Sequence, residues 1–127
     1  MSNPNPPSTK FVHPIEEVFA QILDFYGVRW EYEPRTFPLE WDESGNVIEA
    51  FTPDFYLPEQ NLYVELTTLR PQLTTKKNRK LKRIRELYPG INIKLFKRRE
   101  LRNMMLRFGL TEEAERILGS DAQEVQE

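Results

Sequence analysis

The chain has 127 residues, of which 39% are hydrophobic and 30% charged, and this predicts one soluble globular domain. It contains no cysteine and one histidine, His13, which excludes disulfides, thiol nucleophiles, cysteine–zinc sites, His-rich metal centres and a serine–histidine triad. Its apolar runs are short, and none is typical of a membrane span or a signal peptide, so we expect a cytoplasmic protein without membrane contact. Any catalysis must rest on carboxylates and lysines, with or without a hard metal ion.

The net charge of −2 conceals an uneven distribution of charged residues. Residues 1–69 contain 3 Lys/Arg against 12 Asp/Glu, whereas residues 70–107 contain 14 against 2. Residues 108–127 are acidic again, with 1 against 6. The dense basic block indicates a polyanionic partner, because neutralising phosphates releases counterions. The alternative is a solvated helix face whose lysines only improve solubility.

The N-terminal half predicts an arm, one helix and three strands. Residues 1–11 contain three prolines, and we expect a disordered arm there. The helix begins at Pro14, where the missing N–H costs no hydrogen bond, and ends at Gly27. Pro53 predicts a bend, a bulge or an edge position in its strand, because it cannot donate to a ladder. The predicted strands cover residues 28–34, 47–57 and 61–67.

The C-terminal half predicts a crossover connection. A basic helix at about 75–88 is followed by a strand at 91–96, and this arrangement should make that strand parallel to the one before the helix. A second basic helix is expected at about 98–108. We therefore predict a single small α/β domain over residues 12–110, with a mixed central sheet flanked by helices. A short helix and an acidic tail are expected at 111–127.

Two carboxylates stand on consecutive predicted strands. Asp54 and Glu65 are separated by a turn at 58–60, so hairpin pairing would bring them together. They would repel each other unless a cation joins them, and hard oxygen ligands suit Mg²⁺ or Mn²⁺. A third carboxylate comes from the first helix, where Glu16 lies at the margin of the apolar stripe. Glu17 lies nearly opposite that stripe and is expected to face solvent.

This arrangement resembles the PD-(D/E)xK nuclease superfamily. The matching features are Glu16 on a leading helix, TPDF at 52–55 on a strand, and VEL at 64–66 on the next strand, followed by a helix. The resemblance extends over about residues 13–96, and within the superfamily it is closest in general character to Holliday-junction resolvases and transposon end-cleaving endonucleases. It implies a restriction-endonuclease-like fold of order αβββαβ, followed by a C-terminal helix.

The resemblance also implies a set of site residues. Asp54 and Glu65 would bind Mg²⁺, for which Mn²⁺ substitutes, with help from the carbonyl of Leu66, and Glu16 would bind the metal directly or through water. Thr67 stands where the family has its lysine. Some members resemble this chain in having the lysine on the following helix, and TKKNRKLKR is found there.

Lys77 is the lysine that best fits a displaced catalytic role. It lies four residues before Leu81 and seven before Ile84, and so shares the buried stripe of its helix. The alternative is that its stem packs on the sheet while its ammonium group reaches solvent.

These features predict a metal-dependent endonuclease that hydrolyses phosphodiester bonds in nucleic acid, expected to be DNA. Thr67 motivates the alternative, a catalytically lapsed module of the same fold that binds nucleic acid or a protein partner. We expect the protein to act as a homodimer or beside a separate specificity subunit. The residues expected to contact backbone phosphates are Lys76, Arg79, Lys80, Lys82, Arg83, Arg98, Arg99 and Arg102.

Overall fold

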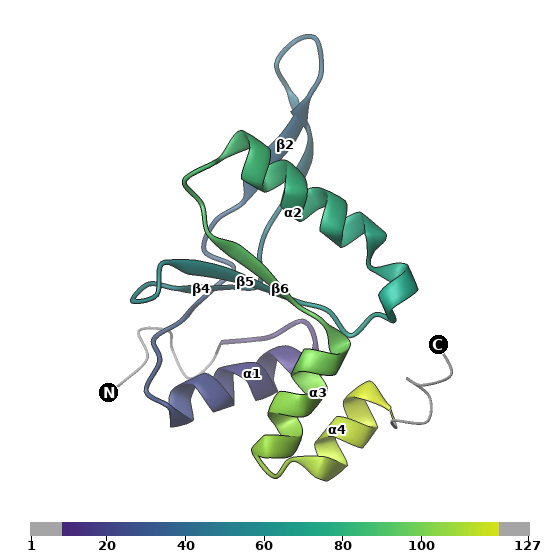
Figure 1. Ribbon diagram of the computed structural model, residues 1–127. Coiled ribbons are helices and arrows are strands. Elements are labelled where there is room, and N and C mark those ends of the chain that lie inside the picture. Colours follow the sequence, from purple (N-terminus) through teal and green to yellow (C-terminus); the bar gives the residue numbers. More distant parts are fainter. Residues whose placement is uncertain (1–8, 120–127) are drawn as a thin grey trace.

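The computed structural model describes residues 9–119 and has a four-stranded sheet between two layers of helices (Figure 1). Helix α2 covers one face of this sheet, and α1, α3 and α4 cover the other. No helix in this part of the chain is long and apolar enough to cross a membrane. The elements in chain order are α1 (Pro14–Phe25), β1 (Glu31–Tyr32), β2 (Phe37–Trp41), β3 (Val47–Phe51), β4 (Phe55–Leu57), β5 (Leu62–Leu66), the 3-10 helix η1 (Pro71–Leu73), α2 (Thr75–Leu87), β6 (Ile93–Phe96), α3 (Arg98–Arg107) and α4 (Thr111–Leu118).

The central sheet is mixed, as predicted. Its strand order is β1-β4-β5-β6, with β4 antiparallel to both β1 and β5. Strand β6 runs parallel to β5, with Tyr63 opposite Ile93, and α2 makes the crossover between them. The predicted parallel pair is therefore confirmed. Of the strand predicted at 28–34, Glu31–Tyr32 forms strand β1, and the next residue, Glu33, donates its backbone N–H to the carbonyl of Asp54.

The segment 47–57 forms two strands and not the single strand predicted. Strand β3 ends at Phe51 and pairs with β2 in a separate two-stranded sheet, whereas β4 begins at Phe55 in the central sheet. Pro53 lies between them and has no N–H to continue a ladder. The next N–H, that of Asp54, donates to the side chain of Glu65. The predicted bend is confirmed and the predicted continuity is wrong; β2 lies outside the predicted strands.

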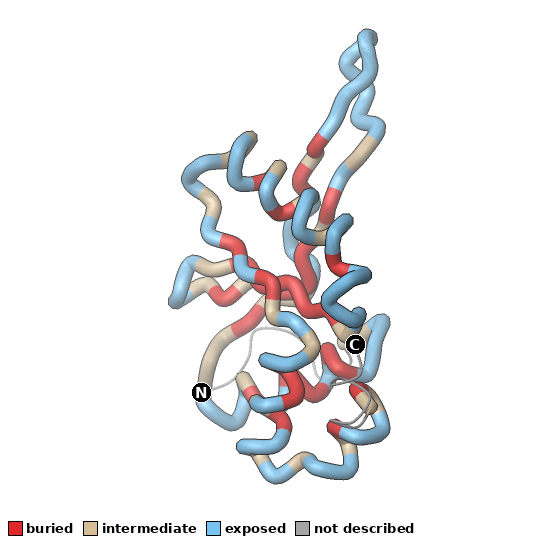
Figure 2. The backbone as a smooth tube through the Cα atoms, turned by 45° about the vertical axis from the view of Figure 1, so that its right-hand side comes forward, coloured by how far each residue is buried: buried red, intermediate tan, exposed pale blue. Residues whose placement is uncertain are grey.

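Strands β2 and β3 form a hairpin arm that projects from the body of the protein (Figures 1 and 2). Its root is buried through Phe37, Leu39 and Phe51, and its tip is exposed. The turn at the tip is held by Asp42, whose Oδ1 accepts the backbone N–H of Asn46 at 2.8 Å. The arm is thus anchored at one end and solvated at the other.

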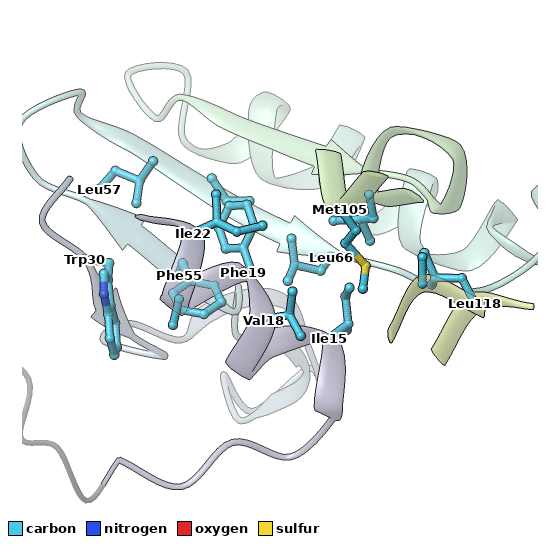
Figure 3. Packing of buried hydrophobic residues seen from close by; sticks show 14 residues of the cluster. Ile15, Val18, Phe19, Ile22, Trp30, Phe55, Leu57, Leu66, Met105 and Leu118 are labelled. Carbon is cyan, nitrogen blue, oxygen red and sulfur yellow. The ribbon is translucent and has the colours of Figure 1, made fainter. Parts of the chain in front are cut away.

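Apolar residues form one core cluster on each face of the central sheet. On α1, Ile15, Val18, Phe19 and Ile22 recur at helical spacing, and all four are buried against the sheet together with residues of α3 and α4 (Figure 3). Each such side chain stabilises the fold by about 1.5–3 kcal/mol relative to an exposed one. The burial of this stripe fixes the orientation of α1, and with it the direction in which Glu16 points.

The second cluster lies under α2 and includes the root of the hairpin arm. Helix α2 buries Leu81 and Ile84 there, while most of its other residues are basic. Tyr63 belongs to this cluster, whereas Val64 and Leu66 belong to the first. Since side chains alternate along a strand, Glu65 shares the α2 side of β5 with Tyr63.

Both ends of the described chain pack against the body. Phe11 lies with its ring centroid 4.9 Å from that of Tyr32 and 5.8 Å from that of Trp30. Residues 1–8 of the predicted arm and 120–127 of the predicted tail lie outside the described residues. Helix α4 confirms the short helix predicted after residue 110.

Candidate functional site

Asp54 and Glu65 are adjacent where β4 and β5 pair. The register pairs Phe55 with Val64. Asp54, the residue before β4, therefore lies opposite Glu65 of β5. The Asp54 N–H donates to Glu65 Oε1 at 3.1 Å, and the Leu66 N–H donates to Asp54 Oδ2 at 2.9 Å. Both side chains are buried. The proximity predicted from hairpin pairing is therefore confirmed.

Glu16 enters the same region from the start of α1. Its Oε1 accepts hydrogen bonds from the backbone N–H of Val12 at 3.0 Å and from that of His13 at 3.4 Å, which caps the helix. The hydroxyl of Tyr32 donates to the same oxygen at 2.6 Å. Glu16 is buried and Glu17 is exposed, as the position of each on the helix predicts.

Lys77 reaches the carboxylates from the first turn of α2. Its Nζ lies 2.8 Å from Glu65 Oε2 and donates to the carbonyl oxygen of Leu66 at 2.9 Å. The Lys77 side chain is 29% exposed, whereas that of Glu65 is 6% exposed. Two arrangements of Lys77 were expected from sequence. The structure has the one in which the ammonium group points inward, where it makes an ion pair with Glu65. Its neighbour Lys76 is exposed.

The site concentrates negative charge. Burial, followed by the adjacent charges of Glu65 and Glu16, raises the pKa of Asp54 to about 8, although the hydrogen bond from Leu66 opposes this rise. Burial also raises the pKa of Glu65, and the ammonium group of Lys77 opposes that rise. Without a further cation, the site therefore favours retaining a proton.

A cavity of about 350 Å³ exposes these groups to solvent. Thr67 lines it and is itself buried. Its Oγ1 accepts the N–H of Leu69 at 3.1 Å, which turns the chain after β5. Thr67 thus shapes the wall of the site and supplies no charge. The cavity is lined by Val12, His13, Ile15, Glu16, Glu33, Asp54, Glu65, Leu66, Thr67, Thr68, Leu69 and Lys77.

The oxygen atoms that line the site are of the kind that bind hard divalent cations. The carboxylates of Asp54 and Glu65 and the carbonyl of Leu66 are oxygen donors of the kind that Mg²⁺ and Mn²⁺ prefer. Within residues 9–119, however, no three His, Cys, Asp or Glu side chains form a ready-made metal cluster. Glu16 is hydrogen-bonded to Tyr32, and Lys77 holds Glu65. Lys77 also occupies the Leu66 carbonyl oxygen, so two of these donors are engaged by its ammonium group.

The residues expected to bind phosphates fall into three groups, of which two contain residues at the surface. Lys76, Lys82 and Arg99 are exposed. Arg79 is paired with Glu49 of the hairpin arm at 2.8 Å, and Lys80 lies over the Phe51 ring, 5.8 Å from its centroid. The first group presents charge to solvent, and the second also holds α2 against the arm.

Three further arginines of that set make contacts within the protein. Arg83 donates to the carbonyl of Leu39 at 3.3 Å. Arg98 donates to the carbonyl of Leu118, and Arg102 donates to that of Gly119. Arg102 is only 6% exposed, so the structure places it in the interior and not on the surface expected from sequence. The end of α4 covers it.

Tyr32 and Glu33 belong to the site but lie outside the set predicted from sequence. Tyr32 holds Glu16 through its hydroxyl, and Glu33 lines the cavity. In the sequence, these residues belong to an alternation of charged and aromatic residues at 31–33. This alternation predicts a strand, but it does not indicate which face of the strand meets α1.

Comparison with protein-family models, with curated proteins and with solved structures finds no match. The resemblance to the nuclease superfamily therefore rests on the residues of this chain and on their arrangement.

Proposed function

We propose that this protein is a metal-dependent endonuclease that hydrolyses phosphodiester bonds in nucleic acid, with DNA as the expected substrate. The observation that supports this most is the convergence of Glu16, Asp54, Glu65 and Lys77 on one solvent-connected cavity. These groups come from three separate regions of the chain, and the cavity also has a basic helix at its edge.

The proposal assigns a role to each of these residues. Asp54, Glu65 and the Leu66 carbonyl would hold Mg²⁺, and Glu16 would bind it directly or orient it through water. When bound, the ion lowers the pKa of its water and neutralises charge on the phosphate. Lys77 carries the positive charge that the family's lysine provides, and it would hold the scissile phosphate or the attacking water.

Substrate binding would use the exposed face of α2. Lys76 lies in the same first turn as Lys77, and Lys82 lies further along the helix. Contacts of such residues with backbone phosphates are independent of sequence. Through these groups, the protein would therefore bind nucleic acid without recognising its base sequence.

Cleavage of a panel of labelled linear and branched DNAs with Mg²⁺ or Mn²⁺ tests the proposal. Asp54→Asn and Glu65→Gln keep the size of each side chain and are expected to abolish cutting while circular dichroism shows a folded protein. Glu59→Gln, an exposed residue on the turn between the same strands, is the matched control. Undiminished cutting by Asp54→Asn would reject the assignment.

Two observations favour a second candidate, a catalytically lapsed module that binds nucleic acid. Lys77 already neutralises Glu65 in the structure, and Thr67 leaves the family's lysine position uncharged. Titration with Mn²⁺ by calorimetry separates the two functions, because a lapsed site gives no specific heat of metal binding while DNA binding persists.

A further inference from the structure

Lys77 binds the two acceptors that a metal ion would need. Its Nζ is 2.8 Å from Glu65 Oε2 and 2.9 Å from the Leu66 carbonyl oxygen. Both acceptors lie on β5, while the lysine comes from α2. The ammonium group therefore joins the helix to the strand through the same pair of oxygen atoms that the proposed function assigns to Mg²⁺.

An ammonium group and a divalent ion would compete for these oxygens. A metal–oxygen bond of about 2.1 Å leaves no room for Nζ at hydrogen-bond distance from the same lone pairs. The two cations would also repel each other, and at equal distance a divalent ion attracts the carboxylates twice as strongly as an ammonium group does.

The cavity retains negative charge when Lys77 is counted. Of the described residues that line it, Glu16, Glu33, Asp54 and Glu65 are acidic, and Lys77 is the lysine among them. One ammonium group does not balance four carboxyl groups, so the cavity still attracts a stronger cation.

The position of Lys77 on its helix is unfavourable in the absence of Glu65. Lys77 is the third residue of α2, and the first turn of this helix contains no acidic residue. A cation in the first turn is repelled by the positive end of the helix dipole. The ion pair with Glu65 offsets that repulsion, and losing it would leave Lys77 driven away from the helix start.

We propose that Lys77 is the resident cation of the site and that it competes with a divalent metal ion for Glu65 and Leu66. Metal loading then releases the ammonium group from both oxygens, so the lysine becomes available to the substrate only in the loaded site. The inference rests on the proposed metal function, and the experiments below distinguish the failure of each.

Metal affinity tests the competition directly. Titrating Mn²⁺ into the full chain by calorimetry should give binding at least about tenfold tighter for Lys77→Met than for the unaltered protein, because a neutral side chain of similar length replaces the competing charge. Lys76→Met, an exposed neighbour on the same turn, should leave the affinity unchanged. Equal or weaker Mn²⁺ binding by Lys77→Met would overturn the inference.

A second measurement uses the unaltered protein, and so does not depend on the variant folding. Labelling with an amine-reactive reagent, followed by mass spectrometry, should show slow modification of Lys77 in EDTA and at least about fivefold faster modification at saturating Mn²⁺. Lys76 should react at the same rate in both conditions. Mn²⁺ binding with no change at Lys77 overturns the competition but leaves the metal function intact. Absence of Mn²⁺ binding by both the unaltered protein and Lys77→Met overturns both. Binding by Lys77→Met alone supports the competition and favours the lapsed module.

Discussion

Asp54 and Glu65 brace each other across two strands. The backbone N–H of Asp54 donates to the Glu65 carboxylate, and the Asp54 carboxylate accepts the N–H of Leu66, the residue after Glu65. These two hydrogen bonds join the chain segments just beyond the last ladder pair, Phe55 with Val64. The two acidic groups are held close together by the same contacts that join β4 to β5.

The stability of the metal-free protein should depend on pH through Asp54. Its pKa of about 8 in the folded protein lies above the ordinary value of 3.8. Its contribution to stability is therefore complete below about pH 4 and is lost as pH rises through about 8. Thermal unfolding in EDTA should show the melting temperature falling between these limits, and Asp54→Asn should flatten the slope.

Glu59→Gln serves as the control for that titration, because Glu59 is exposed on the intervening turn. It should reproduce the slope of the unaltered protein. An identical slope in Asp54→Asn would show that another group is responsible.

Removing the hydroxyl of Tyr32 should loosen Glu16. Tyr32→Phe deletes the 2.6 Å hydrogen bond to Glu16 Oε1, and hydrogen bonds to charged groups stabilise proteins by about 1.5–3 kcal/mol. Urea unfolding should report a loss of roughly that size. Tyr56→Phe, which removes an exposed hydrogen bond to Asn61, should cost much less, and equal losses in both variants would contradict the prediction.

Glu16 and Glu17 form a matched pair for testing the third carboxylate. Glu16→Gln keeps an oxygen that can accept the helix-capping N–H groups but removes the charge, and we expect cleavage to fall roughly 10- to 100-fold. Glu17→Gln on the exposed face should leave the rate unchanged. Initial rates on one labelled DNA at saturating Mg²⁺ make the comparison, and similar rates for both variants would remove Glu16 from the site.

Nucleic-acid affinity should depend on exposed lysines and not on Arg102. Lys76→Ala and Lys82→Ala should each weaken DNA binding and reduce the salt dependence of the logarithm of affinity by about 1. Arg102→Ala should instead lower stability, because its guanidinium group is buried against the end of α4. Fluorescence anisotropy at several salt concentrations measures the slopes. An unchanged slope in both lysine variants would place the binding surface elsewhere.

The site residues could be predicted from sequence where the spacing of apolar residues along one helix decides which way a side chain points. Glu16 faces inward because it lies beside a continuous apolar stripe, and Lys77 does so because it precedes Leu81 by one helical turn. The sequence could not show where the Lys77 ammonium group ends. That depends on the distance between α2 and β5, which is set by the packing of the second core cluster.

Other features depend on contacts between distant parts of the chain. Strand β2 contains Pro38, which disfavours a central strand, and it forms only because its partner β3 gives it a two-stranded sheet of its own. Arg99 and Arg102 look equivalent in the basic run, yet one is exposed and the other is covered by α4. Local patterns carry no information on such coverage.

The root of the hairpin arm packs against helix α2. Phe37 and Phe51 share a core cluster with Leu81, and Glu49 makes an ion pair with Arg79. The arm therefore contacts α2 through both apolar packing and an ion pair. A close-packed interior transmits strain instead of absorbing it. The root of the arm and the helix that carries Lys77 therefore belong to one packed unit, so the position of the arm and that of the lysine are fixed together.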